Sequence, residues 1–68
     1  MPIVTVELWE GRPVETKKKL AEDITHAIVD NLKCPPQAVT VLFRDSPMHN
    51  WAMGGKLASE QFKDKAGK

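Results

Sequence analysis

The sequence predicts an α+β fold: a single βαβ unit with two parallel strands, followed by a short C-terminal hairpin and assembled as an oligomer. Two stretches alternate apolar and polar residues, at 2–9 and 38–44, and an apolar stripe of helical period lies between them. A helix of about 19 residues between two strands is the right-handed crossover that joins parallel strands. The 68 residues leave room for one domain, spanning 1–68, and for no second core.

Residues 2–9 form the first predicted strand, because the segment is rich in β-branched side chains that alternate between two faces. One face carries Val4, Val6 and Leu8, and the other carries Ile3, Thr5, Glu7 and Trp9. The pattern breaks at Gly11, which permits a turn, and at Pro13, which suits the first turn of a helix. We therefore expect a helix to follow directly.

The expected helix presents one apolar stripe, made of Leu20, Ala21, Ile24, Ala27, Ile28 and Leu32. The run Lys17-Lys18-Lys19 is expected to belong to the solvated face of the same helix. Pro35 and Pro36 end the helix, because proline lacks an N–H donor and forces the residue before it out of the helical region.

Residues 38–44 form the second predicted strand, with Val39, Val41 and Phe43 on one face and Thr40, Leu42 and Arg44 on the other. A loop is expected over 45–50. A hairpin follows, with extended residues 51–53, a turn at Gly54-Gly55 and a return over 56–58. Residues 59–68 form a charged tail that contains Phe62, and we expect it to be frayed or docked on a partner.

Composition excludes several classes of function. Ten basic and nine acidic side chains give a net charge of +1, which provides no large field to attract nucleic acid or an anionic membrane. No apolar run approaches the ~20 residues of a membrane span. The single cysteine, Cys34, cannot form an intrachain disulfide and fits a reducing, cytoplasmic location. Cys34, His26 and His49 are too scattered to form a zinc site, so we expect no metal.

The predicted unit cannot bury its own apolar surface. A two-stranded parallel sheet under one helix leaves a sheet face and both edges open, whereas parallel sheets are normally covered on both faces. A chain of this size often depends on disulfides, metal or oligomerisation for stability. With the first two excluded, self-association is the expected support.

Familiar catalytic motifs are missing from the sequence. The stretch 54–56 lacks the spacing of a phosphate-binding loop, and neither Ser46 nor Ser59 lies in a nucleophile elbow. Cys34 is interpreted as a structural thiol and His49 as a loop residue, with thiol reactivity and substrate contact as the alternatives.

Pro2 is the remaining candidate. An initiator methionine is ordinarily removed before proline, which leaves a secondary amine whose pKa, like that of other α-amino groups, is ordinarily about 8. In an apolar pocket this pKa falls, because desolvation disfavours the ammonium form, and the amine becomes a base suited to neutral pH. Removal of Met1 would therefore make Pro2 a general base.

The residues from Pro2 to Arg12, the helix and second strand, and the segment 51–58 together resemble the 4-oxalocrotonate tautomerase family. The specific pieces are the N-terminal proline, Glu-Gly-Arg at 10–12, and Trp-Ala-Met-Gly-Gly-Lys-Leu-Ala at 51–58. The resemblance implies short βαβ chains assembled as homohexamers, trimers of dimers. It also implies an isomerase for keto–enol proton transfer in small unsaturated 2-oxo acids, of the kind formed in aromatic degradation, that works without a cofactor.

The resemblance also implies a role for four residues. Pro2 matches the proline that accepts a proton and returns it at a different carbon. Arg12 matches an arginine that binds a substrate carboxylate from a neighbouring subunit, where its planar fork makes two charge-assisted hydrogen bonds. Trp51 matches a pocket aromatic that lowers local polarity. Trp9 stands where the family uses a backbone N–H to contact substrate or an ordered water, and its large side chain would reshape the pocket entrance.

One position departs from the family pattern. Founding members carry a second arginine on the second strand, and the aligned residue is Thr40, whose hydroxyl supplies no positive charge. We therefore expect weaker stabilisation of a dienolate and poor turnover of the dicarboxylate 4-oxalocrotonate. Arg44 lies on the same strand face about 13 Å away, and we hypothesise that it tunes substrate choice across a subunit boundary.

The alternatives to a tautomerase are a hydratase, dehalogenase or decarboxylase of the same superfamily, and a non-catalytic oligomeric scaffold.

Overall fold

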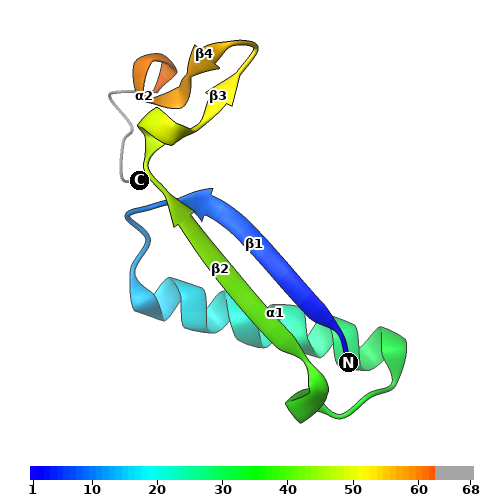
Figure 1. The fold of residues 1–68 in the computed structure, drawn as a ribbon. Helices are drawn as coiled ribbons and strands as arrows, with labels where there is room; N and C mark the ends of the chain where they lie inside the picture. Colours follow the sequence, from blue (N-terminus) through cyan, green and yellow to red (C-terminus); the bar gives the residue numbers. More distant parts are fainter. Residues whose placement is uncertain (63–68) are drawn as a thin grey trace.

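The computed structural model describes residues 1–62. Two strands flank a long helix in the sequence, and a hairpin with a short helix follows them (Figure 1). The elements are β1 (Ile3–Trp9), α1 (Val14–Leu32), the 3-10 turn η1 (Pro36–Ala38), β2 (Thr40–Ser46), a second 3-10 turn η2 (Met48–Asn50), β3 (Ala52–Met53), β4 (Lys56–Leu57) and α2 (Ala58–Gln61). This order confirms the predicted βαβ unit with its C-terminal hairpin.

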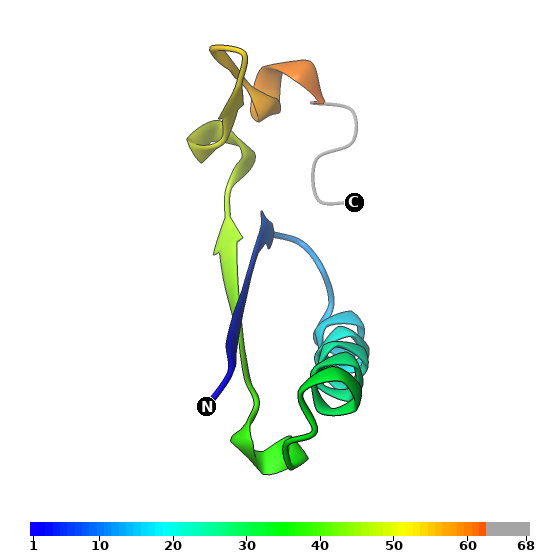
Figure 2. The same ribbon diagram turned by 90° about the vertical axis from the view of Figure 1, so that its right-hand side faces the viewer.

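β1 and β2 pair in parallel, with Ile3 opposite Thr40 and Trp9 opposite Ser46. The side chains alternate as predicted: those of Val4, Val6, Leu8, Val41 and Phe43 are half-buried, whereas those of Ile3, Thr5, Glu7, Thr40, Leu42 and Arg44 are exposed. Figure 2 shows α1 on one side of the strand pair. Among residues 1–62, no element covers the other side, so this face of the sheet is open.

β2 begins two residues later than the sequence pattern predicted and extends to Ser46. The cause is η1, in which Ala38 N–H donates to Pro35 O and Val39 N–H to Pro36 O, at 3.0 and 3.1 Å. Only the start of the strand differs, so the side chains from Thr40 to Arg44 keep their predicted alternation, whereas Val39 lies outside β2.

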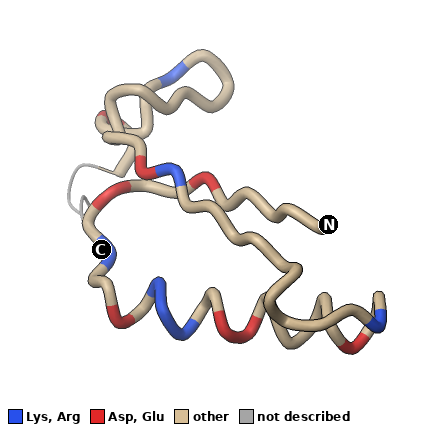
Figure 3. The backbone as a smooth tube through the Cα atoms, turned by 60° about the horizontal axis from the view of Figure 1, so that its bottom comes forward, with Lys and Arg blue, Asp and Glu red and all other residues tan. Residues whose placement is uncertain are grey.

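α1 has the predicted length of 19 residues, and acidic and basic residues are interspersed along it (Figure 3). Two details of its predicted faces are wrong. Lys17 is half-buried and paired with Asp45, with Nζ 2.6 Å from Oδ2, and so does not belong to the solvated face. Leu32 is 59% exposed. A 19-residue helix spans about 28 Å and a seven-residue strand about 23 Å, so the last turn extends beyond the sheet.

The hairpin turns at Gly54 and Gly55, whose φ angles of 62° and 81° fit the positive values that a type I′ turn requires at both positions. The expected loop is replaced in part by η2, and the start of the expected tail by α2. Gln61 Nε2 donates to Met53 O at 3.2 Å and to Lys56 O at 3.0 Å, which ties α2 to the hairpin.

The predicted tail, 59–68, is therefore ordered within its own chain as far as the structure describes it. Phe62 N–H donates to Ala58 O at 2.8 Å, and the Phe62 ring packs on Trp9. Residues 59–61 belong to α2, and the ring of Phe62 packs on Trp9, so the segment is not frayed as far as residue 62. Its docking on a partner stays a prediction. The rest of the tail lies outside the described residues.

Little of the chain is buried. Among the described residues, only Met48 and Ala58 are buried apolar side chains. Both belong to the segment 48–62, which contains η2, β3, β4 and α2 and which we call the hairpin unit. The radius of gyration is 14.8 Å, against roughly 11 Å for a compact domain of this length. The βαβ unit thus exposes apolar side chains such as Ile3 and Leu42, 64% and 45% exposed, that a neighbouring chain would cover.

Lys33 caps α1 in the left-handed conformation, with φ 58° and ψ 42°, and its N–H donates to Val29 O. A side chain at this backbone conformation is strained, whereas glycine is not. We expect Lys33→Gly to raise the free energy of unfolding by roughly 0.5–1 kcal/mol, after the added chain entropy of glycine is subtracted. Urea denaturation at fixed protein concentration measures the change. Lys33→Ala is the control, and equal stability of the two variants would contradict the prediction.

Candidate active site

Pro2 and Thr40 are neighbours at one end of the strand pair. Pro2 precedes β1, and its carbonyl accepts a hydrogen bond from Thr40 N–H at 3.0 Å. The Pro2 ring is half-buried, whereas Met1 before it is 93% exposed. The residue beside the predicted base is therefore a neutral hydroxyl, on a strand face that is open to a ligand or to another chain.

Trp9, Arg12 and Trp51 lie near the opposite end of β1. The rings of Trp9 and Trp51 meet edge to face, with centroids 5.8 Å apart and planes at 78°. Arg12 is exposed in the connection between β1 and α1. Figure 1 shows the N-terminus and the hairpin at opposite ends of the strand pair. Since the seven residues of β1 span about 23 Å, one chain does not bring Pro2 to Arg12.

The segment that carries Arg12 is anchored on both sides by the end of β2. Before Arg12, Glu10 N–H donates to Ser46 O at 3.0 Å. After it, Lys17 Nζ pairs with Asp45 Oδ2 at 2.6 Å. Two consecutive residues of β2 therefore hold the connection, which limits the positions that the guanidinium can sample.

The backbone of Trp9 faces the open edge of β1. Pro2 O accepts a hydrogen bond from Thr40 N–H of β2, and Glu10 N–H donates one to Ser46 O of β2. A parallel ladder uses alternate residues, so the intervening residues, Trp9 among them, direct their N–H groups away from β2. This geometry is compatible with the predicted role of the Trp9 N–H, which stays a prediction.

Arg44 lies opposite Glu7 in the register, on the open face of the sheet. Four register positions separate it from Thr40, or about 13 Å along the strand. Within one chain, Arg44 therefore does not replace a charge at the Pro2 end, and its proposed influence on substrate requires a second chain.

Phe62 is the residue that the sequence analysis did not assign to this end of the molecule. Its ring centroid lies 5.4 Å from that of Trp9, with the planes tilted by 44°. The only local signal was a lone aromatic residue in a charged segment, which does not reveal a partner more than fifty positions away in the sequence.

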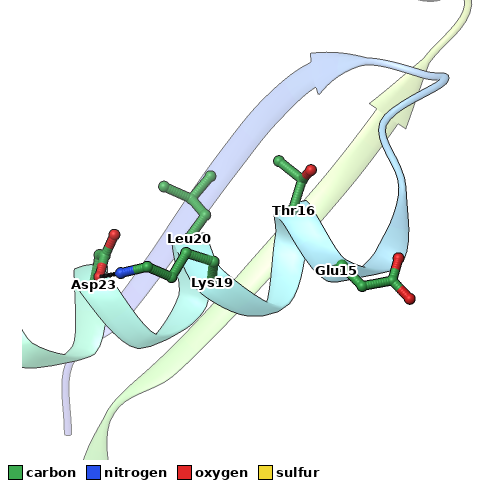
Figure 4. A pocket seen from close by; sticks show the side chains of 5 residues that line it. All are labelled: Glu15, Thr16, Lys19, Leu20 and Asp23. Carbon is green, nitrogen blue, oxygen red and sulfur yellow. Dashed lines mark hydrogen bonds and ion pairs between the residues drawn. The ribbon is translucent and has the colours of Figure 1, made fainter.

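A further feature lies on the first turns of α1, which follow the Arg12 connection. An open hollow of about 450 Å³ on α1 is lined by Glu15, Thr16, Lys19, Leu20 and Asp23 (Figure 4). There the hydrogen bond from Lys19 to Asp23 raises the pKa of the lysine above its ordinary value. Within residues 1–62, no group of three or more His, Cys, Asp and Glu side chains could hold a metal ion. No helix in the same range is long and apolar enough to cross a membrane.

The fold and these placements define a class of small βαβ protein, in which a proline precedes the first strand and an arginine with two tryptophans follows it. The family described as tautomerase enzyme matches residues 2–61. A probable tautomerase of Streptococcus pneumoniae is 38% identical over 60 residues, covering 88% of this chain and 100% of the relative. The 2-hydroxymuconate tautomerase of Comamonas testosteroni is 37% identical, covering 88% and 95%.

Solved structures agree. A 4-oxalocrotonate tautomerase isozyme of Methylibium petroleiphilum superposes with a TM-score of 0.85 at 33% identity, covering 90% of this chain and 98% of that one. A heterohexameric 4-oxalocrotonate tautomerase of Chloroflexus aurantiacus gives 0.84 at 27% identity, covering 88% and 97%. The chain therefore belongs to the tautomerase family and shares the fold of 4-oxalocrotonate tautomerase homologues, which confirms the resemblance predicted from its motifs.

The Lys17–Asp45 pair is expected to stabilise the Arg12 segment measurably, because both side chains are partly shielded, at 25% and 36% exposed. A double-mutant cycle with Lys17→Met and Asp45→Asn should give a coupling of about 0.5–1 kcal/mol. The matched control is Lys19–Asp23, a more exposed pair at 71% and 56%, which should couple less strongly. Urea denaturation measures both couplings, and a control coupling as large as the first would contradict the expectation.

Proposed function

We propose that the protein is a cytoplasmic, cofactor-independent tautomerase that interconverts the enol and keto forms of small unsaturated 2-oxo acids, with the Pro2 amine as general base. Family membership supports an isomerase of this kind. The observation that carries the proposal is the position of Pro2, half-buried at the start of β1 and at the first residue of the family match.

The chemistry requires that Met1 be removed, because an acylated proline nitrogen has no basic lone pair. The free amine accepts the proton of the enol hydroxyl and returns it to a carbon of the conjugated chain. One O–H bond is exchanged for one C–H bond, so the step needs no oxidant, reductant or metal. A low-polarity surrounding favours the neutral amine over its ammonium form, which keeps the base active near neutral pH.

We propose that each site is shared between chains. Arg12 of one chain would bind the substrate carboxylate with two charge-assisted hydrogen bonds, and Trp9 and Trp51 would exclude water around the Pro2 amine of another chain. The roughly 23 Å between Pro2 and Arg12 in one chain supports this arrangement. Two chains related by a twofold axis would bring unlike ends of β1 together. The relative from Chloroflexus aurantiacus is itself a heterohexamer.

Pro2 is the first test. Intact-mass spectrometry should find the chain without Met1, and the protein should ketonise phenylenolpyruvate or 2-hydroxymuconate in an assay that monitors ultraviolet absorbance. Pro2→Ala should lower kcat by about 100-fold or more, because it replaces a rigid secondary amine with a primary one. Retention of Met1 in an active protein, or an unchanged rate in Pro2→Ala, would contradict the mechanism, whereas no turnover by a chain that lacks Met1 would favour the scaffold alternative.

Arg12 and Arg44 are distinguished by kinetics on two substrates. Arg12→Ala should raise the KM for 2-hydroxymuconate by about tenfold or more, since it removes a charge-assisted contact to a carboxylate. Arg44→Ala should alter the preference between the dicarboxylate 2-hydroxymuconate and the monocarboxylate phenylenolpyruvate, with a smaller effect on each rate. If Arg44→Ala left both substrates unaffected while Arg12→Ala abolished turnover, the proposed role of Arg44 would be wrong.

A further inference from the structure

Three aromatic rings from distant segments meet at the end of β1. Trp9 ends that strand, Trp51 precedes the hairpin, and Phe62 follows α2. The centroid distances are 5.8 Å between Trp9 and Trp51 and 5.4 Å between Trp9 and Phe62. Both pairs lie within the range in which aromatic rings attract one another. We refer to Trp9, Trp51 and Phe62 as the aromatic cluster.

The backbone beside each outer ring is fixed. Trp51 N–H donates to Met48 O at 3.2 Å, and Trp51 O accepts from Ala58 N–H at 2.7 Å. Phe62 N–H donates to Ala58 O at 2.8 Å. Ala58, which is fully buried, thus links the two outer members of the cluster. The two outer rings are therefore held by the folded hairpin unit, and their contact with Trp9 is not an accidental contact of a loose end.

The central ring is held by packing. Trp9 Nε1 is buried and has no hydrogen-bond partner among residues 1–62. A buried donor without an acceptor is unfavourable, so the orientation of the indole depends on the rings against it. Loss of Phe62 would remove one of the two rings that pack on Trp9 and would leave Trp51 in place.

The charges near the cluster suit one carboxylate. Arg12 follows Trp9 by three residues, and the nearby Lys17 is already paired with Asp45. At the Pro2 end, Thr40 provides a neutral hydroxyl. Arg44 lies opposite Glu7, about 13 Å along β2 from Thr40, so within one chain a second carboxylate beside Thr40 would have no cation to neutralise it. A flat apolar substituent would instead gain contact with the rings.

We propose that Phe62 is a specificity-determining residue: with Trp9 and Trp51 it forms an aromatic wall that selects 2-oxo acids, or their enols, with one carboxylate and a flat aryl group. The proposal rests on the proposed function, and it adds the class of substrate. The aryl group lies against the cluster, and the carboxylate binds Arg12. Phe62 takes no part in proton transfer and acts on the choice between substrates.

The test compares kcat/KM for phenylenolpyruvate and 2-hydroxymuconate in the full-length native protein and three variants. Phe62→Ala should lower the value for phenylenolpyruvate about three- to tenfold and that for 2-hydroxymuconate less than about twofold. Phe62→Tyr keeps the ring and should retain the native ratio. Leu32→Ala, which shortens an exposed apolar side chain away from the site, should change neither substrate. An equal decrease for both substrates in Phe62→Ala, or an unchanged ratio, would overturn the proposal.

A binding measurement separates this proposal from the proposed function. Calorimetry should show that phenylpyruvate binds the native protein more tightly than 2-oxoglutarate, and that Phe62→Ala removes the preference while Phe62→Tyr keeps it. If the native protein turned over neither enol, the proposed function would fail. The calorimetry alone would then decide whether the aromatic cluster selects acids with an aryl group. Equal affinities for the two acids in the native protein, or a preference that survives Phe62→Ala, would overturn the aromatic wall.

Discussion

Parallel pairing of β1 with β2 is the interaction on which the other features of this chain depend. The register joins Pro2 to Thr40 at one end and brings Trp9 beside Ser46 at the other. It also sets the end of β2 that holds the Arg12 connection through Asp45 and Ser46. A slip of one residue would turn the apolar face toward solvent and separate these contacts. The pairing thus positions both ends of the proposed site and keeps them apart.

The same pairing explains why one chain is incomplete. A two-stranded sheet has one face under α1 and one face open, and the βαβ unit contains no fully buried apolar side chain among the described residues. The stability that a larger core would provide has to come from contacts between chains. In our proposal the same contacts complete the chemistry, because they bring Arg12 of one chain to Pro2 of another. Folding and catalysis would then both require contacts between chains.

Local periodicity made most of the fold predictable. β-branched alternation located β1, and the apolar stripe with its terminal prolines located α1. The predictions from the sequence fail where contacts between residues far apart in the sequence determine the position of a side chain. Lys17 left the solvated face because Asp45, 28 positions away, pairs with it. Phe62 joined Trp9 through a ring contact that leaves no pattern in the sequence. The site residues came from motifs, but their separation along β1 became visible only in the structure.

The central claim is that Pro2 and Arg12 act from different chains, and subunit mixing tests it most directly. Pro2→Ala and Arg12→Ala would each be assayed alone at a substrate concentration well below the native KM, where both have low activity, and the two would then be unfolded together and refolded as mixed assemblies. If the site is shared, random mixing restores both native groups in about a quarter of the sites, and a corresponding share of the native activity returns. If the mixture shows only the summed activity of the two separate variants, the groups do not act across chains, and the account is contradicted.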